Sequence, residues 1–132
     1  MISMVAALAA TLAALGGVVW SGIVRRRALH YRLIAITFLC LAVAIWRAEV
    51  FGRSLLFEGT ALTVHRVHMV AVALTFLTLP FVVTTGVRLA RASGGESVAA
   101  RASHKKLAVR FVTLLLVTAA LGTAMTLLAV PA

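Results

Sequence analysis

Four histidines carry most of the chemistry that this 132-residue sequence can offer. His30 and His104 each stand just before a long apolar run, and His65 and His68 stand three residues apart just before and within another. Imidazole nitrogens bind haem iron, copper and zinc. The alternative interpretation is that histidines near the ends of membrane helices serve only as interfacial polar residues.

Hydrolytic and paired-carboxylate chemistry has little support in the sequence. The chain has no aspartate, and its three acids are Glu49, Glu58 and Glu96. Serine and threonine are scattered without a base beside them, and the glycine pairs match no phosphate-binding fingerprint. We therefore expect a protein that binds a cofactor or a partner rather than an enzyme.

The composition indicates a membrane protein. Hydrophobic residues make up 63% of the chain, charged residues only 12%, and the mean hydropathy is +1.11, whereas soluble domains carry about 25% charged residues. The net charge of +10 would suggest nucleic acid on a soluble protein, but here the cations cluster between long uncharged runs. We expect membrane lipids, and no nucleic acid, among its partners.

Four charge-free runs define the expected spans. A membrane-spanning helix needs about 20 mostly apolar residues. The run at 33–46 is too short alone and must continue past Arg47 and Glu49 to Phe51. We predict one all-α integral membrane domain over residues 1–132, with four transmembrane helices in an up-down-up-down bundle, at about 2–24, 31–51, 64–90 and 104–130.

The positive charges predict the orientation of these helices. Ten cations fall on one side of the spans and three, Arg47, Arg53 and Arg66, on the other. The positive-inside rule places the first side in the cytoplasm and both termini outside. The ten inner cations are Arg25, Arg26, Arg27, Arg32, Arg88, Arg91, Arg101, Lys105, Lys106 and Arg110.

Two groups of these cations are the expected lipid or partner contacts. Arg25, Arg26 and Arg27 follow the first run, and Lys105 and Lys106 begin the fourth predicted helix. Basic residues beside a membrane helix attract anionic headgroups.

His30 and His104 are expected at one depth, because both open helices that run in the same direction. In a sequentially wound four-helix bundle these two helices lie diagonally across the core. The pattern therefore predicts a b-type haem held by His30 and His104 near the cytoplasmic face.

His65 and His68 lie on one face of one helix, so they cannot approach a haem iron from opposite sides. Together with a third group they could chelate copper or zinc, or one of them alone could serve as an axial ligand.

The order of these features resembles a bacterial membrane family known as domain of unknown function 420. The matching features are His30 with Arg32 and Leu33, a histidine in the third helix, and a basic start of the fourth helix. This basic start is His104, Lys105, Lys106 and Arg110, and a Thr- and Gly-rich end follows at Thr118, Gly122 and Thr123. The sequence before Met69 and Val70 makes His68 the family's third-helix histidine.

The resemblance implies a role in the bacterial cytoplasmic membrane, because family members resemble a factor for maturation of haem A-containing cytochrome oxidase. It implies that the protein holds or delivers haem or copper, with His68 as an outer ligand, and docks a larger respiratory membrane complex or a second copy of itself. Two alternatives are a small b-type cytochrome that carries electrons and a structural accessory subunit without a cofactor.

Overall fold

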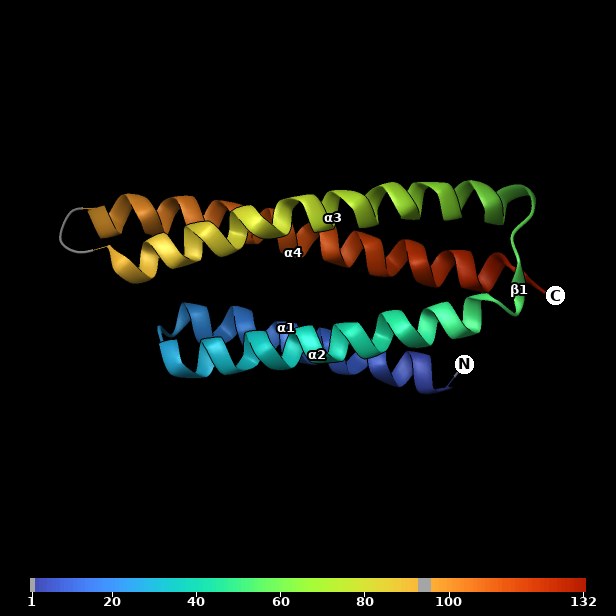
Figure 1. The fold of residues 1–132 in the computed structure, drawn as a ribbon, viewed down its shortest axis with the longest axis horizontal. Coiled ribbons are helices and arrows are strands. Elements are labelled where there is room, and N and C mark those ends of the chain that lie inside the picture. The colour runs from blue at the N-terminus through green and yellow to red at the C-terminus, as the bar shows by residue number, and fades with distance from the viewer. Residues whose placement is uncertain (1, 93–95) are drawn as a thin grey trace. The chain divides into compact units, whose positions relative to one another are not determined.

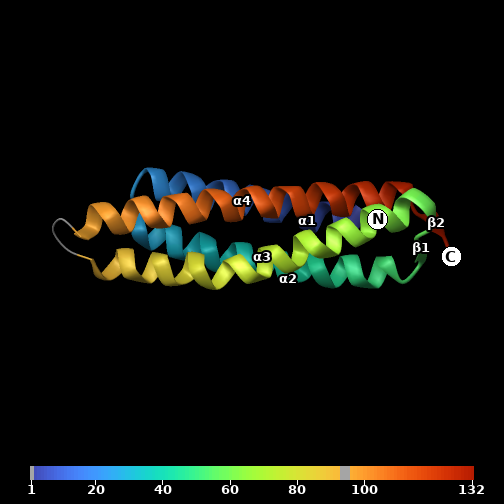
Figure 2. The ribbon, with the colours of Figure 1, turned by 90° about the horizontal axis from the view of Figure 1, so that it is seen from above.

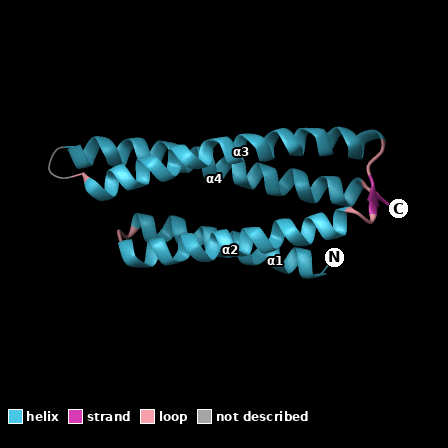
Figure 3. Ribbon diagram, viewed as in Figure 1, coloured by secondary structure: helices cyan, strands magenta, loops and turns pink. Residues whose placement is uncertain are grey.

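The computed structural model describes residues 2–92 and 96–132 and is almost entirely α-helical (Figure 3). The all-α fold class is therefore confirmed, with four long apolar helices. The helices are α1 (Ile2–Ile23), α2 (Arg27–Gly52), α3 (Gly59–Arg91) and α4 (Glu96–Leu128), and the two short strands are β1 (Leu55–Leu56) and β2 (Val130–Pro131).

The chain divides into two compact units, each built on one antiparallel helical hairpin (Figures 1 and 2). The first comprises Met1–Leu55 with Pro131–Ala132 and contains α1 and α2; the second comprises Leu56–Val130 and contains α3 and α4. We call them the first hairpin and the second hairpin. Each can be described by the contacts between its own two helices.

All four helices are long and apolar enough to cross a membrane. The 22 residues of α1 extend about 33 Å and the 33 residues of α3 about 50 Å, against a hydrocarbon core of about 30 Å. Large apolar side chains such as Leu39, Leu77 and Phe81 are more than 60% exposed. Acyl chains suit this surface better than water does, so the chain is a small multi-pass membrane protein.

Three helices begin earlier than the charge-free runs predict. Helix α2 begins at Arg27, α3 at Gly59 and α4 at Glu96. Arginine, lysine and alanine are good helix formers, so the backbone stays helical through residues that end an apolar run. The helices therefore continue past the segments that a bilayer would cover.

Small and hydroxyl-bearing residues line the contact between the helices of each hairpin. Thr11 and Ser21 of α1 and Thr75 of α3 are buried. Thr11 donates its hydroxyl to the Ala7 carbonyl, and Thr75 to that of Ala71, each at 2.8 Å. Because these hydroxyls are satisfied within their own helix, they can lie at an apolar helix contact without leaving an unpaired polar group.

Candidate functional site

His30 of α2 packs against the end of α1 within the first hairpin. Its Nδ1 atom lies 2.9 Å from the carbonyl oxygen of Val18 and 3.2 Å from Oγ of Ser21. Ser21 is fully buried and gives its own proton to the Val18 carbonyl. The imidazole lies against Gly22, where an added Cβ atom would come within 3.3 Å of its Cε1 atom. Glycine thus leaves the space that the ring occupies.

His104 of α4 has an equivalent environment within the second hairpin. Its Nδ1 atom lies 3.3 Å from Oγ1 of Thr85, and an added Cβ atom on Gly86 would lie 3.2 Å from its Cε1 atom. The Thr85 hydroxyl donates to the carbonyls of Phe81 and Val82, at 2.8 and 3.0 Å. With its single proton on either carbonyl, the hydroxyl oxygen is an acceptor for Nδ1–H of His104.

The two hairpins hold these histidines by the same local sequence. A hydroxyl residue and a glycine occupy residues 21–22 and 85–86, near the end of the first helix of each hairpin, and His30 and His104 come from the second helix. Sequence reasoning missed the hydroxyl–glycine pairs. The recurrence of Ser-Gly and Thr-Gly, each followed within three residues by arginine, was the signal that could have revealed them.

His68 of α3 is anchored in a third place, farther along the second hairpin. Its Nδ1 atom lies 3.0 Å from the carbonyl oxygen of Thr118 on α4. An added Cβ atom on Gly122 would lie 3.0 Å from the Cε1 atom of His68. The hydroxyl of Thr118 in turn contacts that of Thr75 at 3.1 Å. A polar cluster thus joins α3 to α4 in the apolar part of the hairpin.

These contacts set the tautomer of two rings and are compatible with the same tautomer in the third. A carbonyl oxygen only accepts, so Nδ1 of His30 and of His68 must carry the proton. His104 takes the same tautomer when the Thr85 hydroxyl donates to the carbonyls of its own helix. In neutral imidazole the lone pair then lies on Nε2. Histidines that bind a metal or haem iron through one nitrogen almost always donate the other N–H to such an acceptor.

His65 lies one helical turn from His68 and has different neighbours. Its Nδ1 atom lies 3.4 Å from Sδ of Met125 on α4. The ring of Phe57 stacks on the imidazole, with centroids 4.9 Å apart and an interplanar angle of 15°. His65 therefore contacts a thioether and a phenyl ring, whereas Nδ1 of His68 is hydrogen-bonded to a backbone carbonyl.

The predicted copper or zinc site on His65 and His68 lacks a third conventional ligand nearby. Among residues 2–92 and 96–132, no group of three or more His, Cys, Asp or Glu residues is placed to hold a metal ion. Any metal bound here would need a ligand of another kind.

The cations expected to contact lipid are exposed on both hairpins, at the turn of the first and within α4 of the second. Arg25 and Arg26 lie in the tight turn between α1 and α2, with Arg25 in the left-handed region at φ 59°, and Arg27 begins α2. The guanidinium carbon of Arg26 lies 5.9 Å from the ring centroid of Trp20. Lys105 and Lys106 are exposed on α4. Each hairpin thus presents cations where its charge-free segment ends.

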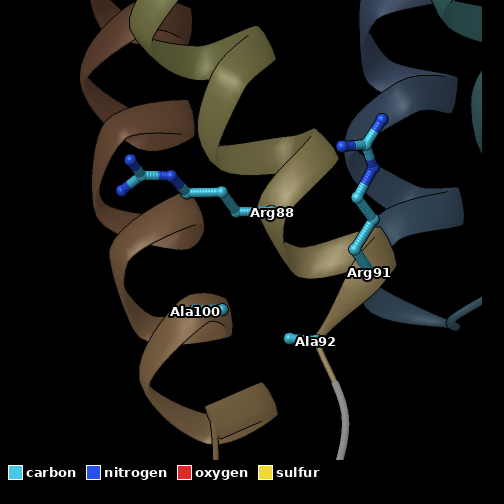
Figure 4. A pocket seen from close by; sticks show the side chains of 4 residues that line it. All are labelled: Arg88, Arg91, Ala92 and Ala100. Atoms are coloured by element: carbon cyan, nitrogen blue, oxygen red, sulfur yellow. The ribbon is translucent and has the colours of Figure 1, made fainter.

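A shallow pocket of about 310 Å³ lies where α3 ends and α4 begins in the second hairpin (Figure 4). It is lined by Arg88, Arg91, Ala92 and Ala100. Figure 4 shows the two arginine side chains leaving α3 in opposite directions, with Arg88 reaching toward α4. Because they diverge, the two guanidinium groups do not form a single clamp for one anion.

Comparisons of the chain with family models, with curated proteins and with solved structures give no match. The fold and the sites together define a small multi-pass membrane protein with histidines anchored at helix–helix contacts.

Proposed function

We propose that this protein holds haem or copper through its membrane histidines and passes it to a larger respiratory complex, in maturation of a haem–copper oxidase. His30, His104 and His68 are the proposed haem ligands. The observation that carries the proposal is the shared anchoring of Nδ1. In each of these rings Nδ1 lies within hydrogen-bond distance of an oxygen on the neighbouring helix of its own hairpin, beside a glycine.

This anchoring suits haem because of what it does to the ring. The hydrogen bond from Nδ1 sets the tautomer, restrains the ring orientation and raises the basicity of Nε2. Haem iron binds neutral imidazole nitrogen, and the group supplies reversible one-electron chemistry when bound. The chain's contribution is to orient the rings and to surround them with an apolar setting.

The partial exposure of the same rings supports delivery rather than permanent storage. His30, His68 and His104 are all half-buried. A carrier must receive and release its cargo, and ligands at the rim of a helix pair permit both. A chain without aspartate and with three glutamates also has few groups for catalysing bond cleavage.

The exposed cations support a location in the bacterial cytoplasmic membrane. Arg25, Arg26 and Arg27 with Lys105 and Lys106 are the proposed contacts to anionic headgroups, worth about 1 kcal/mol per cation near such a surface. The exposed apolar faces of the helices would contact acyl chains and the oxidase or a second copy of the chain.

Haem titration of the purified full chain in detergent tests the proposal. Addition of ferric haem should give a Soret band typical of histidine ligation, and His30→Ala, His104→Ala and His68→Ala should each weaken or shift it. His65→Ala is the matched control and should leave the band unchanged. Equal spectra for all four variants, with helix content unchanged by circular dichroism, would refute these ligands.

The biological role is tested by deleting the gene and measuring oxidase assembly. Loss of assembled oxidase, restored by the wild type and not by His30→Ala, would support maturation. Rapid reversible reduction of the haem-loaded protein by a quinol analogue, with normal oxidase assembly in the deletion strain, would favour the electron-carrier alternative instead.

A further inference from the structure

We infer that His65 and Met125 form a binding site for monovalent copper at one end of the second hairpin. The inference rests on the proposed function, in which copper is one of two cargoes, and names the ligands and the oxidation state. Its basis is the 3.4 Å separation between Nδ1 of His65 and Sδ of Met125. The two residues stand 60 positions apart in the chain, so only the pairing of α3 with α4 brings them together.

The distance fits one ion bound to both atoms. Metal–nitrogen and metal–sulfur bonds of about 2.0 and 2.3 Å allow the two ligand atoms to be up to about 4.3 Å apart. A separation of 3.4 Å therefore corresponds to a bent N–Cu–S arrangement that does not require the two ligand atoms to move apart.

The ligand types select the metal. Thioether sulfur is soft and favours Cu(I), and imidazole also suits copper. Both ligands are neutral, which suits a monovalent ion better than a divalent one. Structural zinc sites need four ligands, drawn from Cys, His and carboxylates, and the described residues place no three such groups together.

Phe57 restrains the imidazole in this site. Its ring is stacked on that of His65, with centroids 4.9 Å apart, so it covers one face of the ligand and keeps water from that side. Copper at Nδ1 requires the tautomer with the proton on Nε2. The ring stays neutral in both tautomers, so its proton is relocated and its charge does not change.

Competition for Cu(I) tests the site on the full chain in detergent, under anaerobic reducing conditions, with bicinchoninate as the competing chelator. Met125→Leu preserves side-chain volume and should weaken Cu(I) binding at least tenfold, as should His65→Ala. Met69→Leu is the matched control, because Met69 lies on α3 with His65 and is 51% exposed. This substitution should change the affinity for Cu(I) less than twofold.

X-ray absorption of the Cu(I)-loaded protein provides a second readout. A sulfur neighbour at about 2.3 Å that disappears in Met125→Leu is expected. A nitrogen-only shell, or equal affinity of Met125→Leu and wild type, would show that the contact is only an N–H···S hydrogen bond. Haem binding is measured separately. If Met125→Leu keeps its Soret band and loses no copper, the His65–Met125 copper site alone is refuted. If the protein binds copper but shows no Soret band, the haem ligands alone are refuted.

Discussion

The imidazole of His68 lies so close to Gly122 that a Cβ atom on the glycine would be 3.0 Å from Cε1 of the ring, the tightest such approach among the described glycines. The same ring donates Nδ1–H to the Thr118 carbonyl at 3.0 Å. Gly122 therefore provides the space that lets the hydrogen bond form. A side chain there must displace the ring or separate the helices.

Gly122→Ala is predicted to destabilise the second hairpin by about 1–3 kcal/mol, because the added methyl group overpacks a close helix contact. Gly16→Ala is the control, since nothing lies within 4 Å of a Cβ atom added there; it should be neutral or stabilising by up to about 1 kcal/mol. Unfolding free energies in mixed micelles would measure both. Equal effects of the two substitutions would contradict the close contact.

Thr85→Val is predicted to disturb His104 because it removes the oxygen that accepts from Nδ1. The expected cost is about 0.5–1.5 kcal/mol of unfolding free energy. Thr84→Val removes a hydroxyl that is exposed and bonded to the Phe81 carbonyl, and should cost less than about 0.5 kcal/mol.

The nitrogen shifts of His104, measured by NMR with labelled histidine, provide an independent check. The wild type should carry the proton on Nδ1, and Thr85→Val should change the Nδ1 signal whereas Thr84→Val should not. A proton on Nε2 in the wild type would be inconsistent with the assigned tautomer.

Thr75 and Thr118 are predicted to stabilise the second hairpin as a pair, since their hydroxyl oxygens lie 3.1 Å apart across the helix contact. This bond requires one of the two hydroxyls to turn its proton away from the carbonyl of its own helix, Ala71 or Leu114. A double-mutant cycle with Thr75→Val and Thr118→Val should give a coupling of about 0.6 kcal/mol, the average for such bonds between membrane helices, and no more than about 1.7 kcal/mol. Additive effects of the two substitutions would mean that the hydroxyl pair contributes nothing.

The orientation remains a prediction from the charges, and single-cysteine labelling tests it. In a Cys40→Ser background, a membrane-impermeant maleimide applied to intact cells should label Ser54→Cys but not Ser103→Cys. Ser103→Cys should react only after the membrane is permeabilised. The reverse pattern would place the ten-cation side outside and contradict the positive-inside assignment.

The fold class followed from the sequence because hydropathy is additive along the chain. Four apolar runs separated by cations suffice to predict four membrane helices. The first residues of the helices could not be predicted as well, and α4 begins at Glu96 rather than near 104. The reason is that His104, Lys105 and Lys106 limit the apolar segment but are compatible with a helix.

The environments of the histidines depended on helix register, which hydropathy does not specify. The carbonyl of Val18 and the thioether of Met125 meet His30 and His65 only because the paired helices adopt one particular alignment. From the sequence, Met69 was the methionine adjacent to His68, whereas the one in contact with His65 comes from the opposite helix. The recurring hydroxyl–glycine pairs were readable, but their meaning required the structure.

The most direct test of the cargo-holding function is the absorption spectrum and copper content of the full chain, purified in mild detergent from cells that assemble a haem–copper oxidase. We predict a reducible Soret band, bound copper, or both. Loss of the band in His30→Ala would assign it to haem held by His30, and loss of copper in Met125→Leu would assign the metal to the His65–Met125 pair. A colourless, copper-free protein that binds neither added haem nor added Cu(I) would contradict the cargo-holding function.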